Sequence, residues 1–214
     1  QILLEKLFGG GGGSSEPLRR QEVRASAPQV YNPLKFSLGG YLKIDTIDHM
    51  GRTFAVEQVS EFTRQIGKRT LRFTDYSLHD PDPSLGPDGF WLTLRVIPKE
   101  GGSDCMLLRP AFESGYTQEL ADALEGAELR DDETGVLYRR LGAYEASIRE
   151  ETKDGLNRLS VKYWDYINEE GPEPRFYVVE MDLSDKEGWI QTYRGSPIPV
   201  EDVKPIAGHT SVTA

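Results

Sequence analysis

Apolar and polar residues alternate in short runs along most of the chain from position 41 onward. The first runs are "YLKID", "RTFAVEQVSEFTRQ", "RTLRFTDYSL" and "GFWLTLRVIP". A period of two is typical of strands with one face buried, and Gly51, Gly67 and the turn-rich "HDPDPSLGPDG" separate these runs. The pattern predicts an antiparallel meander in the first half of the chain.

A second set of strands is predicted from "AYEASIREET", "NRLSVKYWDYI", "RFYVVEMDL" and "GWIQTYRG". Between the two sets, a short helix is expected from Thr117 to Leu124, with Thr117 as its N-cap and Gly126 as its stop. A hairpin around Asp131 to Gly135 follows. The fold class is therefore mainly β (α+β), with one short interior helix.

The stretch "RFTDYSLHD" returns in altered form as "VKYWDYINEE". Four pairs share one offset: Phe73 and Tyr163, Asp75 and Asp165, Tyr76 and Tyr166, and Phe54 and Tyr144. Repetition of a whole unit predicts a duplicated meander, with two pseudo-repeats forming a two-lobed barrel or sandwich. The expected repeats are residues 34–110 and 141–206, joined by a helix and hairpin connector at 111–140 and followed by a tail at 207–214.

The N-terminus has a different pattern. Residues 1–8 predict an amphipathic helix, and residues 9–33 predict a flexible linker rich in Gly, Ser and Pro. The helix would present an apolar stripe of Ile2, Leu3, Leu4, Leu7 and Phe8. A two-turn helix is marginal in water, so the stripe needs support from a protein partner, a membrane interface or its own domain.

Charge and cysteine content narrow the function classes. The formal net charge is −10 and no Lys/Arg cluster is present, so nucleic acid is not an expected partner. The single cysteine, Cys105, excludes an internal disulfide and a multi-thiolate metal site. We therefore expect a cytoplasmic protein, with peripheral contact at the inner face of the membrane through the N-terminal helix as an alternative.

Short motifs along the chain resemble a known family. "GGYLKID", "GRTFAVEQVSEF", "RFTDYSLHD", "FWLTL", "YWDY", "FYVVEM" and "YRGSPIPVEDV" are similar to the bacterial domain family of unknown function numbered 4178, over about residues 38–97 and 142–203. The resemblance implies a β-rich bacterial intracellular domain that occurs beside membrane-stress proteins and polyamine-synthase-like proteins. It supplies no catalytic residues, and the long "HDPDPSLGPDG" turn departs from its pattern.

Candidate chemistry is sparse. His79, Asp80 and Asp82 are weak candidates for a metal site, but one histidine with carboxylates on a Pro-rich turn lacks the ligand order of a calcium or zinc site. A solvated turn is the favoured interpretation. No dinucleotide or phosphate-loop motif is present, so no cofactor is expected.

The two Asp-Tyr pairs have a structural interpretation and a functional one. In the first, each Asp caps the following turn and each Tyr packs with its hydroxyl satisfied. In the second, aromatic and acidic side chains line a candidate groove for a peptide or a small cationic ligand such as a polyamine. The candidate groove residues are Asp75, Tyr76, Trp91, Tyr163, Trp164, Asp165 and Tyr166.

Two functions follow from these patterns. The preferred one is a non-catalytic interaction or adaptor module of a membrane-stress-associated complex, docking on a protein partner or as a homo-oligomer through its N-terminal helix and aromatic β surface. The alternative is a small-ligand-binding protein or enzyme with a site at the junction of the two repeats, where pockets are often found.

Overall fold

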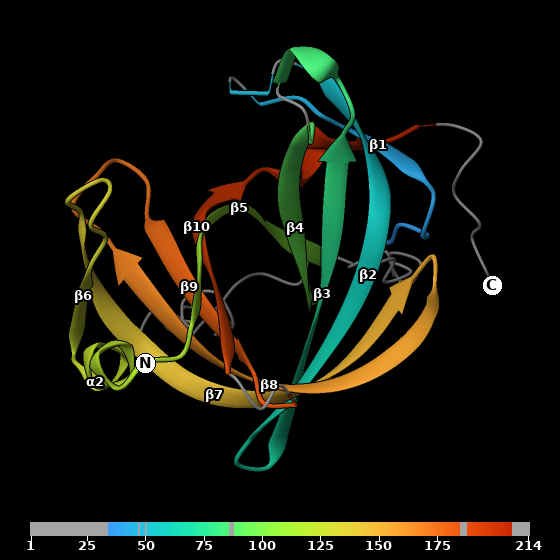
Figure 1. Ribbon diagram of the computed structural model, residues 1–214. Helices are drawn as coiled ribbons and strands as arrows, with labels where there is room; N and C mark the ends of the chain where they lie inside the picture. Colours follow the sequence, from blue (N-terminus) through green and yellow to red (C-terminus); the bar gives the residue numbers. More distant parts are fainter. Residues whose placement is uncertain (1–33, 47, 50, 86–87, 185–187, 207–214) are drawn as a thin grey trace, which may run out of the picture.

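The structure, a computed structural model, describes residues 34–46, 48–49, 51–85, 88–184 and 188–206. The expected helix over residues 1–8, the whole linker over residues 9–33 and the tail from residue 207 lie outside these residues. The described chain is mainly β, as the alternating pattern predicts (Figure 1). Its strands are β1 (Tyr41–Ile44), β2 (Arg52–Ile66), β3 (Arg69–Asp80), β4 (Phe90–Lys99), β5 (Gly102–Gly115), β6 (Glu128–Arg130), β7 (Leu137–Thr152), β8 (Gly155–Asn168), β9 (Arg175–Asp182), β10 (Trp189–Ile198) and β11 (Val203–Pro205).

Eight of the strands close into a ring. The strands run in the order β2-β3-β4-β5-β10-β9-β8-β7, and β7 pairs back onto β2. All of these pairings are antiparallel. The short strands β1 and β11 continue the sheet beyond β2, and β6 continues it beyond β7. The described strands thus form one sheet with a closed ring, which does not confirm the pseudo-repeated, two-lobed barrel or sandwich expected from the sequence.

Two meanders, each of four consecutive strands, build the ring. The first meander is β2 to β5 and the second is β7 to β10. They meet along two seams: β2 pairs with β7 from Gln58–Thr152 to Thr63–Ser147, and β5 pairs with β10 along most of their lengths. Ring closure leaves no long open edge on these strands at the seams, which protects them from pairing with other chains.

Three clusters of buried apolar side chains fill the fold. Alternate residues of a strand point to opposite faces, so strands such as β3 and β8 contribute to the inner cluster with one face and to an outer cluster with the other. The inner cluster contains Phe62, Phe73, Ala146, Ile148, Val161 and Tyr163. One outer cluster lies between the first meander and β1 and β11, and it includes Leu42, Phe54, Tyr76 and Leu94. The other lies on the second meander beneath β6 and the helix, and it includes Leu124, Trp164, Tyr166 and Tyr177.

The expected interior helix is present as α2 (Gln118–Glu125). The side chain of Thr117 accepts a hydrogen bond from the backbone N–H of Leu120, which satisfies one of the free donors of the first turn. Leu124 is fully buried in the outer cluster of the second meander. In Figure 1, α2 and β6 lie together at one flank of the molecule, away from β1.

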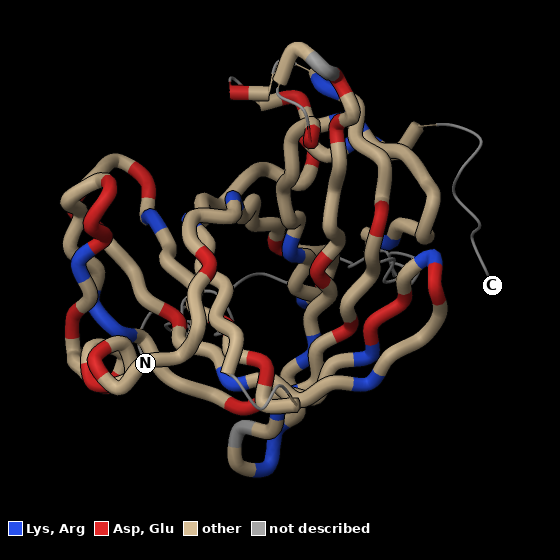
Figure 2. The backbone as a smooth tube through the Cα atoms, in the orientation of Figure 1, with Lys and Arg blue, Asp and Glu red and all other residues tan. Residues whose placement is uncertain are grey.

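Acidic and basic positions are interspersed along the strands (Figure 2). Two short 3-10 turns, η1 (Pro83–Leu85) and η2 (Val200–Asp202), complete the described elements. None of the helices in the described residues combines the length and the apolarity needed to cross a bilayer.

Candidate functional site

Inside the ring, a buried ion pair joins the first meander to the second. Arg95 on β4 donates two hydrogen bonds to Asp75 on β3, from Nε to Oδ1 at 2.9 Å and from Nη2 to Oδ2 at 2.8 Å. The same Nη2 lies 3.5 Å from Oε1 of Glu180 on β9. Since β4 and β9 are not neighbours in the sheet, this contact crosses the ring interior.

A second arginine occupies the same interior. Arg64 on β2 donates from Nη1 to the hydroxyl of Tyr163 at 2.9 Å, and Nη1 lies 3.9 Å from Oδ2 of Asp165. Its guanidinium lies over the ring of Tyr144, 3.6 Å from the ring centroid. The Nε of Arg64 is buried and has no hydrogen-bond partner among the described residues.

Burial shifts the acid-base behaviour of this interior. Desolvation raises the pKa of Glu180 to about 7, although Arg95 opposes the shift. Desolvation also raises the pKa of Asp165, and the pKa of Tyr193 is raised well above its usual value. Two guanidinium groups face three carboxyl groups in this interior, so one carboxyl group has no matching cation, which agrees with the raised pKa values of Glu180 and Asp165.

The structure divides the seven candidate groove residues among three places. Three lie inside the ring: Asp75, Tyr163 and Asp165. Three are buried in the outer clusters: Tyr76, Trp164 and Tyr166. Trp91 is 42% exposed and stacks on His79, with ring centroids 4.4 Å apart. These side chains therefore do not line one groove.

The structural interpretation of the two Asp-Tyr pairs holds for the tyrosines only. The hydroxyl of Tyr76 accepts from the backbone N–H of Phe36 at 3.4 Å, and that of Tyr166 donates to the carbonyl of Leu124 at 3.0 Å. The expectation that each Asp caps a turn is wrong, because Asp75 and Asp165 lie in mid-strand and face the arginines of the ring.

The three weak metal candidates are engaged separately. His79 Nε2 lies 3.1 Å from the carbonyl oxygen of Asp88. Asp80 accepts from Arg52 and from the backbone N–H of Asp82, while Asp82 accepts from the backbone N–H of Ser84. In the described chain, no group of three or more His, Cys, Asp or Glu side chains is placed to hold a metal ion.

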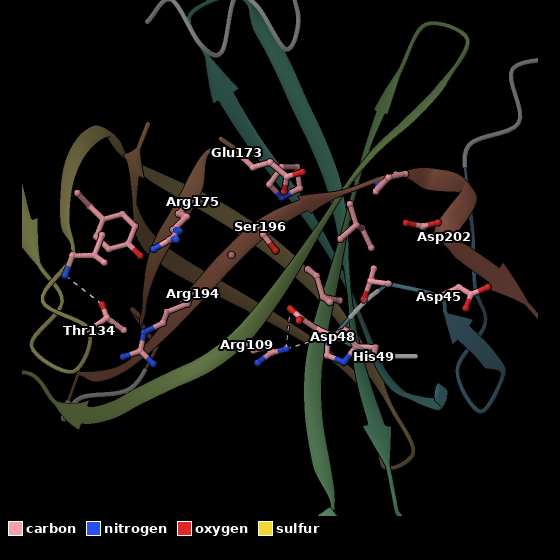
Figure 3. A pocket seen from close by; sticks show the side chains of 18 residues that line it. Asp45, Asp48, His49, Arg109, Thr134, Glu173, Arg175, Arg194, Ser196 and Asp202 are labelled. Atoms are coloured by element: carbon pink, nitrogen blue, oxygen red, sulfur yellow. Dashed lines mark hydrogen bonds and ion pairs between the residues drawn. The ribbon is translucent and has the colours of Figure 1, made fainter. Parts of the chain in front are cut away.

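A wide depression lies between the two meanders, on the outer face of the β5–β10 seam; we call it the junction cleft (Figure 3). Its volume is about 730 Å³. Its lining comes from β5, β7, β9 and β10, from the β1–β2, β6–β7 and β8–β9 connections, and from the segment around η2. The polar lining residues are Asp45, Thr46, Asp48, His49, Arg109, Thr134, Glu173, Arg175, Arg194, Ser196 and Asp202.

Two arginines face each other across the seam that forms the floor of the junction cleft. Arg109 on β5 lies directly opposite Arg194 on β10 in the antiparallel register. Side chains at opposed positions lie about 5 Å apart at Cβ, and like charges there destabilise a sheet. Such a pair requires compensation from other groups.

Acidic groups of the β6–β7 connection compensate Arg194. Its Nε and Nη2 donate to the two carboxylate oxygens of Asp131 at 2.6 and 2.9 Å, and Nη2 also donates to Glu133 at 2.6 Å. Asp131 further accepts from the hydroxyl of Thr134. These hydrogen bonds, led by the one from Arg194, lower the pKa of Asp131 to about 2.

Arg109 has weaker compensation from the β1–β2 connection. Its Nη2 lies 3.8 Å from Oδ2 of Asp48, whose side chain is 77% exposed, and 3.3 Å from Nε2 of His49. His49 is buried against Phe54 and Phe90. Desolvation, followed by the charge of Arg109, lowers the pKa of His49 and so disfavours the protonated ring.

Sequence reasoning missed the junction cleft. Arg109, Arg175 and Arg194 are scattered over 86 positions of the chain and form no basic cluster in the sequence. Only the pairing of β5 with β10 and of β9 with β10 brings them together. The β9–β10 pairing agrees with the meander expected in the second half of the chain, but no signal in the sequence indicated the β5–β10 pairing.

Comparison with known proteins gave no match. A scan against models of protein families, a search of curated proteins and a search of solved structures each found none. The resemblance to the domain family numbered 4178 therefore stays an expectation.

Proposed function

We propose that this chain is a non-catalytic binding module that holds a ligand in the junction cleft. The observation that carries the proposal is an open cleft of about 730 Å³ whose lining is drawn from both meanders. Sites for small ligands commonly have volumes of about 300–1,000 Å³ and lie where structural units meet. Of the two functions expected from the sequence, the cleft supports the alternative one, which places a ligand site at the junction of the two repeats.

The groups of the junction cleft suit binding better than catalysis. His49, the one histidine among the lining residues, is directed at Arg109 instead of at a hydroxyl. The hydroxyl of Thr134 donates to Asp131, a carboxylate whose lowered pKa makes it a poor base. Hydrogen-bonding groups that are fixed in this way can select a ligand without taking part in proton transfer.

The proposal includes a duplicated origin for the two meanders. Asp75 and Asp165 occupy matching places on the second strand of each meander, and each faces an arginine inside the ring. Tyr76 and Tyr166 follow them and face outward in both copies. Duplication would create the junction cleft, because the cleft needs lining residues from both meanders.

A cleft-filling variant tests the binding function. Ser196 on β10 is exposed and lines the cleft, so Ser196→Trp places a large ring there without disturbing a buried position. The matched control is Ser147→Trp, at an exposed position of β7 away from the cleft. Each full-length chain is screened by saturation-transfer NMR against one library of anionic, cationic and neutral fragments.

The wild-type chain and Ser147→Trp are expected to share a set of binding fragments that Ser196→Trp loses. Amide spectra of the three chains establish that the fold is retained. An absence of binding fragments in the wild type, or the same set in all three chains, would overturn the proposed function.

A further inference from the structure

We propose that the junction cleft recognises an oxyanion, a carboxylate or a phosphate, through Arg109 and Arg175 beside the opposed Arg194. This inference rests on the proposed function and adds the chemical class of the ligand. From the sequence, a cationic ligand was one alternative for the aromatic and acidic candidate groove, in a chain with a net charge of −10. The arginines at the β5–β10 seam favour an anionic ligand instead.

The first argument is the imbalance between the two opposed arginines. Arg194 has three short hydrogen bonds to carboxylates, and its side chain is 27% exposed. Arg109 is 48% exposed, and its charged partner Asp48 is both distant and largely solvated. A guanidinium carries five N–H donors, so Arg109 keeps donors available for a ligand.

The second argument concerns what holds Arg109 in place. The Nε2 of His49 lies 3.3 Å from Nη2 of Arg109 and accepts its hydrogen bond, because a guanidinium has donors only. A histidine acceptor holds the guanidinium without bringing a negative charge next to it. Because His49 is buried, with 2% exposure, it gives the arginine a fixed contact. An oriented and uncancelled guanidinium is suited to bidentate binding of a carboxylate or phosphate.

The third argument is Arg175, the first residue of β9. It is exposed, it lines the junction cleft, and no hydrogen bond or ion pair holds its side chain within the described structure. Figure 3 shows Arg175 and Arg194 on the same side of the cleft, with Ser196 next to them on β10. A ligand oxyanion there would meet guanidinium and hydroxyl donors from two strands.

The acidic lining residues limit the ligand to one anionic end. In Figure 3, Asp45 and Asp202 lie together at the far end of the cleft from Arg175 and Arg194. Asp45 is paired with Lys204 at 2.8 Å, while Glu173 is exposed. Arginines therefore lie at the β9–β10 end of the junction cleft, where Asp131 and Glu133 offset the charge of Arg194 only, and unmatched carboxylate charge such as that of Asp202 lies at the acidic end near β1. A second negative charge on the ligand would be repelled at the acidic end.

The test uses the full chain and three defined probes at constant ionic strength: inorganic phosphate, acetate and spermidine. Binding is followed through the arginine Nε–Hε resonances of the wild type, Arg109→Gln and Arg149→Gln. Arg149 on β7 is the matched control, because it is 50% exposed, is paired with Glu61 and does not line the cleft.

Phosphate and acetate are expected to shift the resonances of Arg109 and Arg175 saturably in the wild type and in Arg149→Gln. Loss of one charged hydrogen-bonding group should weaken binding by Arg109→Gln about tenfold or more. Amide spectra report whether that variant keeps its fold.

Three outcomes would overturn the inference. If the anions bind Arg109→Gln as tightly as the wild type, they bind elsewhere. If only spermidine shifts resonances of cleft residues, the cleft binds cations and the proposed function survives without this inference. If none of the probes binds, the oxyanion assignment falls, and the fragment screen with Ser196→Trp decides the proposed function separately.

Discussion

Arg95 and Asp75 lie directly opposite each other on β4 and β3 and form two parallel hydrogen bonds inside the ring. Their residues are 5% and 6% exposed. The guanidinium of Arg95 also lies 4.4 Å from the ring centroid of Phe73. A buried pair of this kind is tolerated only while both charges are present, because each ion lacks water as a substitute partner.

Removal of Arg95 alone is expected to destabilise the fold strongly. Arg95→Met leaves Asp75 buried near Glu180 and without its guanidinium, which should lower the free energy of unfolding by about 3–5 kcal/mol. Urea denaturation measures the change. The control Arg149→Met breaks the exposed pair with Glu61 and should cost less than about 1 kcal/mol. Equal losses in the two variants would contradict this account.

Glu180 is expected to make the stability fall as pH rises through the neutral range. The pKa of Glu180 is about 7 in the folded chain, against 4.5 for the ordinary side chain. The folded state therefore binds more protons than the unfolded state between these values, and stability decreases from about pH 4.5 to 7. The decrease should amount to roughly 1–3 kcal/mol, since one pKa unit corresponds to about 1.4 kcal/mol.

The variant Glu180→Gln isolates this contribution. Glutamine cannot ionise, so the variant should become more stable relative to the wild type as pH rises across the same window. Urea midpoints at several pH values measure the difference. Exposed Glu145 on β7 provides the control, Glu145→Gln, for which the difference should stay constant. A constant difference for Glu180→Gln as well would show that the pKa of Glu180 is the same in the folded and unfolded states.

The strands were predictable because their faces differ in polarity over long runs. In β3, residues from Phe73 to Leu78 point alternately to the two faces of the sheet, and this alternation along the sequence predicted a strand there. The helix was predictable from Thr117 and the sequence after it, since capping is a local interaction. Ring closure was not predictable, because the β2–β7 seam joins residues about ninety positions apart and no local signal specifies its register.

The pair Phe54 and Tyr144 shows where sequence periodicity misleads. The two residues match in the sequence, but Phe54 belongs to an outer cluster and Tyr144 packs against the inner one. In β2 a register shift between Val56 and Gln58 follows Phe54, whereas in β7 the shift between Arg140 and Gly142 precedes Tyr144. One inserted residue exchanges the two faces of a strand, so equivalent positions point in opposite directions.

The interior ion pairs could not be found from the sequence for a different reason. The repeated Asp75 and Asp165 were visible, but their partners Arg95 and Arg64 lie on other strands and belong to no motif. The junction cleft has the same property, because its arginines meet only when the seam forms. Sequence patterns report local structure well, and these contacts depend on long-range pairing.

Asp131 is expected to contribute stability that is lost in acid. Hydrogen bonds, chiefly from Arg194, hold its pKa at about 2, against 3.8 for the ordinary side chain. A lowered pKa stabilises the folded state above about pH 4, and this contribution disappears as pH falls toward 2. Asp131→Asn should therefore be less stable than the wild type by about 1–2 kcal/mol at pH 6, and the difference should shrink below pH 4.

Urea denaturation at a series of pH values from 6 downward measures this effect. Asp154→Asn is the control, since Asp154 is exposed in the β7–β8 turn. A difference between Asp131→Asn and the wild type that does not change with pH would mean that the ion pair with Arg194 is not its source.

Gly89 fixes the entry of the chain into β4, and its replacement should be costly for two separable reasons. Its φ is +69°, in the left-handed region that other residues rarely adopt. A Cβ at this position would also lie 2.5 Å from the carbonyl oxygen of Asp80 and 2.5 Å from Nε2 of His79.

Gly135, in the β6–β7 connection, has a similar φ of +72° but open space around a built Cβ. Gly135→Ala should thus cost about 1–2 kcal/mol from backbone strain alone. Gly89→Ala should lower the free energy of unfolding by a further 1–3 kcal/mol, because the Asp80 backbone must move as well. Urea denaturation of both variants measures the difference; equal losses would mean that the turn before β4 shifts freely to admit a methyl group.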